Sequence, residues 1–187
     1  MKTAICKLQS VTPVTFGKFH QTEKLSRELS DAYEKRTWRE KAHYKDDNTV
    51  FIPGAMFGNC IRESAKFLSM PVPGKGKATF TKHFDSSIIV QNDILLNVKR
   101  DDLQPHAQHV PSDGRAGGTK RVVKIFPVVP NWSGSLTVMI GDDIITADVF
   151  EKVIRNAGQL IGIGTWRPRN RGMNGRFELV DMQWKEN

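Results

Sequence analysis

Apolar residues recur along this chain with two different periods, which predict where helices and strands lie. A spacing of three and four residues predicts helices at residues 22–42, 55–68 and 147–160. Alternation and short apolar runs predict strands at residues 3–8, 49–52, 78–82, 88–90, 94–98, 122–129, 136–140 and 177–184. We expect the first of these strands at the centre of a sheet, and we expect residues 88–90 and 94–98 to flank a turn.

Helix 55–68 has the clearest apolar face. The side chains expected to face inward are Ala55, Met56, Phe57, Cys60, Ile61, Ala65, Phe67 and Leu68. Those expected to face outward are Asn59, Arg62, Glu63 and Lys66. The helix follows Pro53 and Gly54, so its free N–H groups form either an anion site or an ordinary strand-to-helix turn.

The other two helices differ in quality. Helix 147–160 turns six apolar residues inward, and Thr146 or Asp148 is placed to cap it; the six are Val149, Phe150, Val153, Ile154, Ala157 and Leu160. Segment 22–42 has a weaker period and many charges of both signs. It is either a helix or an arm that becomes ordered only against a neighbour or a ligand. Its apolar positions are Leu25, Leu29, Ala32, Tyr33 and Trp38.

Two stretches carry basic residues without an apolar pattern. Residues 71–77 read as a flexible loop, and residues 99–119 lose the pattern before an extended tip at 111–121. His106 and His109 have a spacing that could bind a metal on a helix, but Pro105 and Pro111 flank them. We therefore place both histidines in a loop and expect no metal site.

The order of elements predicts an α+β fold with a ferredoxin-like, RRM-like βαββαβ core. The open sheet face of such folds often binds single-stranded RNA or DNA. We expect a single domain over residues 1–187. It would carry two insertions, a charged helical arm at 18–48 and a basic loop or β-hairpin thumb at 99–121.

Charge narrows the choice of partner. The 187 residues include 28 Lys and Arg against 20 Asp and Glu, which gives a formal net charge of +8. Such an excess favours polyanions, chiefly nucleic acid, and the basic residues cluster in loops instead of forming an amphipathic membrane-binding helix. No apolar run would cross a bilayer, and no leader is evident, so we expect a cytoplasmic protein without membrane partners. The two cysteines, Cys6 and Cys60, are expected to be free buried thiols.

Residues 162–177, G-I-G-T-W-R-P-R-N-R-G-M-N-G-R-F, are the most distinctive stretch. They hold four arginines, four glycines and Trp166 without a carboxylate. Arginine matches phosphate geometry, glycine lets backbone N–H groups approach an anion, and an indole offers a face for a base. The stretch is therefore either a loop that grasps a nucleic-acid backbone or a solvated basic turn with Trp166 in the core.

Two motifs together resemble the RAMP superfamily, the modified RNA-recognition-motif proteins of CRISPR systems. V-F-I-P-G-A-M-F-G-N-C-I-R at residues 50–62 is similar to its strand-Pro-Gly-helix signature, and residues 162–177 are similar to its carboxy-terminal glycine-rich loop. The subunits that polymerise along guide RNA match better than the guide-processing nucleases. The chain departs from the pattern at residues 55–58, where the usual lysine is missing. It also looks like short proteins of tailed phages and prophages.

The resemblance implies a non-enzymatic protein that grips single-stranded RNA or DNA with little sequence preference and assembles side by side along it. The implied backbone contacts are Arg167, Arg169, Arg171, Arg176, the N–H groups near Gly54, Gly58 and Gly172, and Asn59 and Arg62. Secondary contacts are Lys75, Lys77, Arg115, Lys120 and Arg121, each either touching the ligand or simply solvated. Trp166 or Trp38 would stack on a base. Four loop arginines on phosphates would contribute about −2.8 to the slope of log affinity against log salt.

Two other functions stay open. A metal-independent RNA endonuclease of the same superfamily would need a general base, for which His20 is the candidate, and a cation to steady the phosphate. A phage protein that mimics or blocks a CRISPR complex would bind protein partners instead, and phage replication or recombination proteins are further possible partners. No cofactor motif is present, so we expect no cofactor.

Overall fold

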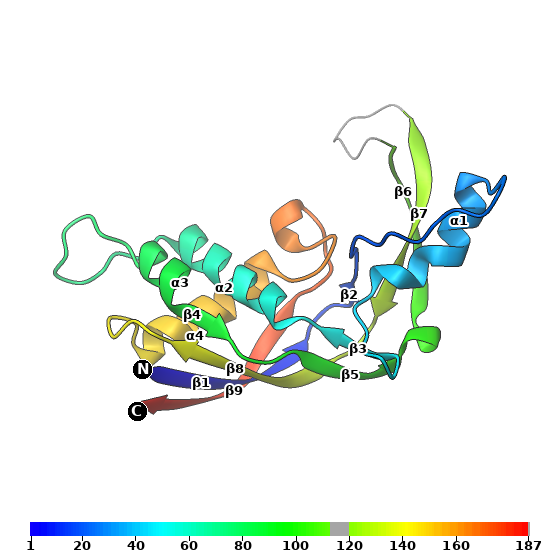
Figure 1. The fold of residues 1–187 in the computed structure, drawn as a ribbon. Helices are drawn as coiled ribbons and strands as arrows, with labels where there is room; N and C mark the ends of the chain where they lie inside the picture. The colour runs from blue at the N-terminus through cyan, green and yellow to red at the C-terminus, as the bar shows by residue number, and fades with distance from the viewer. Residues whose placement is uncertain (113–119, 187) are drawn as a thin grey trace.

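A four-stranded antiparallel sheet carries the core, and two helices cover one of its faces (Figure 1). The computed structural model describes residues 1–112 and 120–186. The strand order is β4-β8-β1-β9, with bounds Ile88–Val90, Ser133–Ile140, Lys2–Ser10 and Phe177–Glu186. The helices are α2 (Gly54–Leu68) and α4 (Ala147–Asn156). Chain order and sheet order together give the ferredoxin-like βαββαβ arrangement, so the predicted fold class is confirmed.

Strand β1 occupies the centre of this sheet, as its sequence predicted. Ala4, Cys6 and Leu8 alternate toward the helices and are buried. Lys2 lies opposite Ile140 of β8 on one side and opposite Glu186 of β9 on the other. The first strand is therefore joined to the last two.

Aromatic side chains fix the helices to the sheet. The ring centroid of Phe57 on α2 lies 5.8 Å from that of Trp132 and 5.6 Å from that of Phe177, while Phe150 of α4 lies 5.9 Å from Trp184 of β9. Cys6 and Cys60 are free and buried, as expected. Burial raises the pKa of each thiol to about 12, so neither is a nucleophile at neutral pH.

The elements outside this core form two smaller sheets and an arm. One sheet has the order β2-β7-β6 and the other pairs β3 with β5. Their bounds are Val14–Thr15, Arg121–Val129, Gln104–Pro111, Thr49–Ile52 and Ile94–Lys99. The arm holds α1 (Ser30–Thr37) and a 3-10 turn (Trp38–Lys41). Figure 1 shows α1 and the β6–β7 hairpin projecting together, at the end of the molecule opposite the loop after α2.

Glu34 holds the arm to the hairpin. Its carboxylate is almost fully buried, and it accepts the Ile125 N–H at 2.7 Å and pairs with the ammonium groups of Lys41 and Lys124. Burial opposes ionisation, but these donors outweigh it and lower the pKa of Glu34. The arm is thus anchored by a charged contact that spans about half of the chain.

The helix predicted at residues 22–42 is shorter in the structure. Only residues 30–41 are helical, because Leu25 and Leu29 are 62% and 77% exposed and provide no buried face for an earlier turn. Arg27 adopts a positive φ of 57°, which ends any helix there.

In α4 the predicted Thr146 cap is present, with the Val149 N–H donating to its hydroxyl. The helix gives way at Ala157–Ile161 to a π turn that leaves Leu160 46% exposed, although its spacing predicted burial.

Two local predictions are also corrected. Residues 78–82 form a turn into helix α3 (Thr81–Ser87) instead of a strand. The strands predicted at residues 88–90 and 94–98 are confirmed, and β4 pairs with β8 while β5 pairs with β3. Residues 104–111 lie in the segment predicted as a basic loop or β-hairpin thumb, and they form β6 with a complete register against β7, so His106 and His109 lie in a strand and not in a loop. As an edge strand β6 tolerates Pro105 and Pro111, and its pairing supplies the order that its own sequence lacks.

The sheet face turned away from the helices carries no aromatic side chain. The aromatics of its four strands, Phe177 and Trp184, point to the helix side, where they contact Phe57 and Phe150. RNA-recognition motifs stack bases on aromatics of the open face. That mode is not available on these strands.

Across the described residues, no helix is long and apolar enough to span a membrane.

Candidate nucleic-acid interface

Residues 162–176 form a folded loop between the π turn and β9, which we call the arginine loop. The Thr165 N–H donates to Thr15 O at 2.9 Å and the Gly175 N–H to Pro13 O at 2.7 Å, so the loop is tied to the segment that enters β2. The Ile163 N–H donates to Gly175 O at 3.0 Å and closes its base. The loop therefore presents its side chains from a fixed backbone.

Glycines in the arginine loop serve its own packing. Gly175 has a φ of 75°, and a Cβ there would lie 1.8 Å from Ile163 O. A Cβ on Gly172 would lie 1.7 Å from Trp166 O. The Gly172 N–H, predicted to face an anion, donates instead to Arg167 O at 3.0 Å. These glycines allow the chain to fold on itself rather than a ligand to approach.

The four predicted arginines have different roles. Arg167 Nη1 lies 3.0 Å from Glu63 Oε2 and Arg169 Nε lies 2.8 Å from Glu63 Oε1, so one carboxylate of α2 holds both. Arg176 donates to the carbonyls of Gln159 and Met173, which makes it a brace of the loop. The Arg171 side chain is exposed and pairs with no side chain in the described part of the protein.

The two predicted stacking residues are covered to different extents. Trp38 is only 5% exposed, and the Arg39 guanidinium lies 4.3 Å from its ring centroid. Trp166 is half-buried, with Phe126 packed at right angles to it at 6.0 Å. Trp38 is thereby excluded, and Trp166 offers at most part of its ring.

A hollow of about 360 Å³, the loop hollow, lies beside the arginine loop. It joins three parts of the chain: the turn after β2, the segment before β3, and α2. The side chains that give it polar character are Lys18, His43, Asn59, Thr165, Arg167 and Asn170. The sequence predicted Asn59 and Arg167 here but missed Lys18 and His43, because only the tertiary fold brings them to the loop.

His43 is the neutral member of this hollow. Burial, and then the nearby Lys18 ammonium, lower the pKa of the imidazole, and Asp93 opposes them only weakly. The ring packs against Phe16 at 6.2 Å and Phe51 at 5.7 Å. At neutral pH the positive charge of the hollow therefore comes from Lys18 and Arg167.

A second hollow of about 530 Å³, the α2 hollow, lies on the other side of Glu63. Its lining residues are Arg62, Glu63, Lys66, Phe67, Asp85 and Arg169. Glu63 thus separates the two hollows, with Arg167 on one side and Arg169 on the other. Phe67 was predicted to face the core, but it is 55% exposed, because the apolar stripe of α2 is wider than the surface it covers.

The start of α2 is already occupied. The Gly54 N–H donates to Asp93 Oδ1 at 3.0 Å, so a carboxylate of the protein fills the predicted anion site. Gly58 is buried against Arg62 and Val90. Arg62 was expected to face outward, but its Nη2 donates to Ile88 O at 2.6 Å. Of the α2 candidates, only Asn59 and Arg62 border a hollow.

The secondary basic residues lie elsewhere. Lys75 and Lys77 are exposed in the loop after α2, and Lys120 and Arg121 are exposed on the hairpin at the opposite end of the molecule (Figure 1). Arg115 lies outside the described residues. None of the four described residues borders either hollow.

His20 is likewise away from both hollows. Its Nδ1 is 3.1 Å from the Thr22 hydroxyl, and its ring stacks on Tyr33 at 6.1 Å. The histidine predicted as a possible general base therefore belongs to the arm. The imidazole that lies beside the arginine loop is that of His43.

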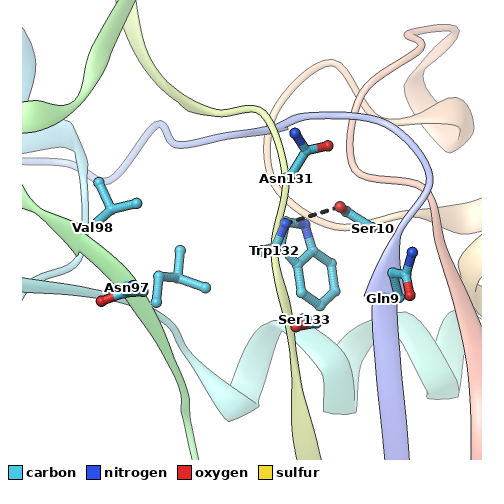
Figure 2. A pocket seen from close by; sticks show the side chains of 8 residues that line it. Gln9, Ser10, Asn97, Val98, Asn131, Trp132 and Ser133 are labelled. Carbon is cyan, nitrogen blue, oxygen red and sulfur yellow. Dashed lines mark hydrogen bonds between the residues drawn. The ribbon is translucent and has the colours of Figure 1, made fainter.

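A third hollow, of about 400 Å³, opens between β5 and the ends of β1 and β8 (Figure 2). Figure 2 shows Gln9, Asn97, Asn131 and Ser133 around it, and the backbone N–H of Trp132 donating to the Ser10 hydroxyl at 2.9 Å. All of its lining side chains are uncharged. It therefore does not extend the basic surface.

The fold and the arginine loop together define an RRM-like α+β protein with a cationic loop beside its first core helix. Its structure is similar to a chain in the "Cryo-EM structure of the Type III-B Cmr-beta bound to cognate target RNA", with a TM-score of 0.54 and 13% identity over 99% of this chain. That overlay covers 61% of the other chain, so this protein spans about three fifths of its length. Cmr6 from Pyrococcus furiosus overlays with a TM-score of 0.47 and 12% identity, covering 96% of this chain and 99% of Cmr6.

Comparison with protein-family profiles finds no match, and neither does comparison with curated proteins. The structural likeness shows a shared fold, which agrees with the α+β, RRM-like architecture predicted from the sequence.

Proposed function

We propose that this protein binds the phosphate backbone of single-stranded nucleic acid, RNA in preference to DNA, without cleaving it. The observation that carries the proposal is the arginine loop, whose locked backbone holds Arg167 and Arg169 at two adjoining hollows. Lys18 faces the same ligand from the first hollow, and Lys66 and Arg62 from the second. Guanidinium groups on a fixed backbone suit phosphates, and such contacts carry little sequence information.

The preference for RNA draws on the similar structure, which is described as bound to cognate target RNA. We further propose that copies assemble side by side along the strand. Phe19, Leu25 and Leu29 of the arm are 80%, 62% and 77% exposed, which suits contact with a neighbouring subunit. Subunits of a CRISPR-type complex, or phage replication proteins, would bind as partners of that assembly.

Fluorescence anisotropy with labelled single-stranded RNA, single-stranded DNA and duplex of equal length tests the proposal over a salt series. The variant R167A/R169A/R171A should weaken binding uniformly across sequences and flatten the salt slope by about 2.1, at roughly 0.7 per lost phosphate contact. Its control, K7A/K152A/K185A, removes the same charge from exposed positions outside both hollows. The control should bind nearly as the wild type does.

The outcomes separate the claims. Binding of intact strands, with stoichiometry that rises with strand length, supports a coating protein. Equal losses in the two triple variants would mean that net charge alone drives binding, and no binding at low salt would refute the nucleic-acid function.

RNA cleavage is the second candidate, favoured by His43 in the loop hollow. A neutral imidazole could take the proton of a 2′-hydroxyl, and Lys18 and Arg167 could stabilise the phosphorane. Attack of O2′ on phosphorus would leave a 2′,3′-cyclic phosphate, and the departing 5′-oxygen would take a proton from the imidazolium or from water to become a 5′-hydroxyl. Cleavage in EDTA that is lost in H43A but kept in H20A would establish this activity.

A further inference from the structure

The proposed interface still needs a surface on which a base can stack. Single-strand binding proteins combine a cationic groove with aromatic rings. Trp38 is buried, Trp166 is half-buried with Phe126 packed at right angles to it, and the open sheet face has no aromatic in its strands. The phosphate-binding groups therefore require a different aromatic partner.

Phe67 meets that requirement. It lies one turn after Glu63 on α2, it is 55% exposed, and it lines the α2 hollow together with Arg62, Lys66 and Arg169. Residues four apart on a helix are neighbours on one face, so Phe67 follows Glu63 in the direction away from the loop hollow. From Asn59 to Phe67 this stripe of α2 is about 12 Å long.

We propose that Phe67 is the stacking platform for an unpaired base of the bound strand, whose phosphate lies between Arg169 and Lys66. This inference rests on the proposed function and extends it. The strand would run along α2, with backbone contacts in the loop hollow and a stacked base in the α2 hollow. Because every base has a π face, the contact would add affinity without sequence preference.

The chemistry of the α2 hollow favours a nucleotide over an apolar protein surface. An apolar partner covering Phe67 would also remove water from three cations and from Glu63 and Asp85, at a large cost. A nucleotide offers a flat ring to Phe67 and an anion to Arg169 and Lys66. Asp85 is a fifth charged group on the rim, so the phosphate is expected on the side away from it.

Two single strands of equal length, one with bases and one without, test the proposal. We would measure anisotropy with a short strand that holds one protein and with a strand of equal length in which every sugar lacks its base. F67A should weaken binding of the base-bearing strand by about 5-fold or more, from the usual worth of one stacking contact. On the abasic strand F67A and wild type should bind equally. F67W should keep full affinity, whereas F67L, apolar but not aromatic, should behave like F67A.

F19A is the matched control, because Phe19 is an exposed aromatic that lines neither basic hollow. It should not distinguish the two strands when one protein is bound. Equal effects of F67A on both strands, or full rescue by F67L, would overturn the stacking role while leaving backbone binding intact. Failure of the wild type to bind either strand would overturn the proposed function itself.

Discussion

Glu63 gives the sharpest quantitative test of how the arginine loop meets a ligand. Its two oxygens occupy Arg167 and Arg169 at 3.0 and 2.8 Å, as two phosphate oxygens would. If phosphate binds these arginines, it must first displace the carboxylate. We therefore expect E63Q to bind single strands more tightly than the wild type.

The magnitude follows from the exposure of the three side chains, which is 29% for Glu63, 24% for Arg167 and 52% for Arg169. Ion pairs this close to solvent contribute about 0.2 to 1 kcal/mol each. Releasing both should raise affinity by about 2- to 30-fold. The gain should shrink as salt increases, because the pairs are screened.

Anisotropy titrations at several salt concentrations measure this effect. E151Q is a close control, since Glu151 is 38% exposed and pairs with Arg155 at 2.7 Å on α4, outside both basic hollows. It makes the same chemical change and should leave affinity almost unaltered. Weaker binding by E63Q would refute the displacement argument and show that Glu63 positions the arginines for the ligand. Unchanged binding would show that these arginines do not contact phosphate.

Two further predictions concern the loop and the hollow beside it. G175A should destabilise the protein and weaken binding, because Gly175 combines a φ of 75° with a Cβ position 1.8 Å from Ile163 O. G74A is the control, since Gly74 has a φ of 73° with open space around its Cβ position. Urea unfolding should show that G74A lowers the free energy of unfolding by only about 1 kcal/mol. The pKa of His43 is lowered in the folded protein. Below about pH 6.5 the unfolded chain therefore binds the proton more readily, and the stability of the fold decreases as the pH is lowered. H43N should flatten that part of the stability profile, and an unchanged slope would contradict the burial argument.

The core elements were predictable because each carries its own apolar pattern. Strand β1 alternates over Ala4, Cys6 and Leu8, and α2 and α4 repeat with the helical period, so local sequence identifies them. Strand β6 does not alternate in this way, and its order comes from pairing with β7. Helix α3 and the extended part of the arm likewise depend on contacts that no local pattern records.

The candidate site was only partly predictable for the same reason. The density of arginine and glycine marked residues 162–177, but it could not show that Arg167 and Arg169 meet Glu63, over 100 positions earlier in the chain. Lys18 and His43 carry no local signal at all. Helical spacing even placed Phe67 in the core, because spacing identifies an apolar stripe and not the width that neighbouring elements cover.

The central position of β1 also bears on how the chain folds. Both neighbours of β1 come from the C-terminal third of the sequence, so the first strand gains no partner until the ribosome has released residues 133–140. Until then both of its edges carry unpaired backbone groups, which invite pairing with other chains. Such long-range pairing slows folding and exposes intermediates to aggregation. Truncations that remove β9 should therefore yield insoluble protein rather than a smaller folded domain.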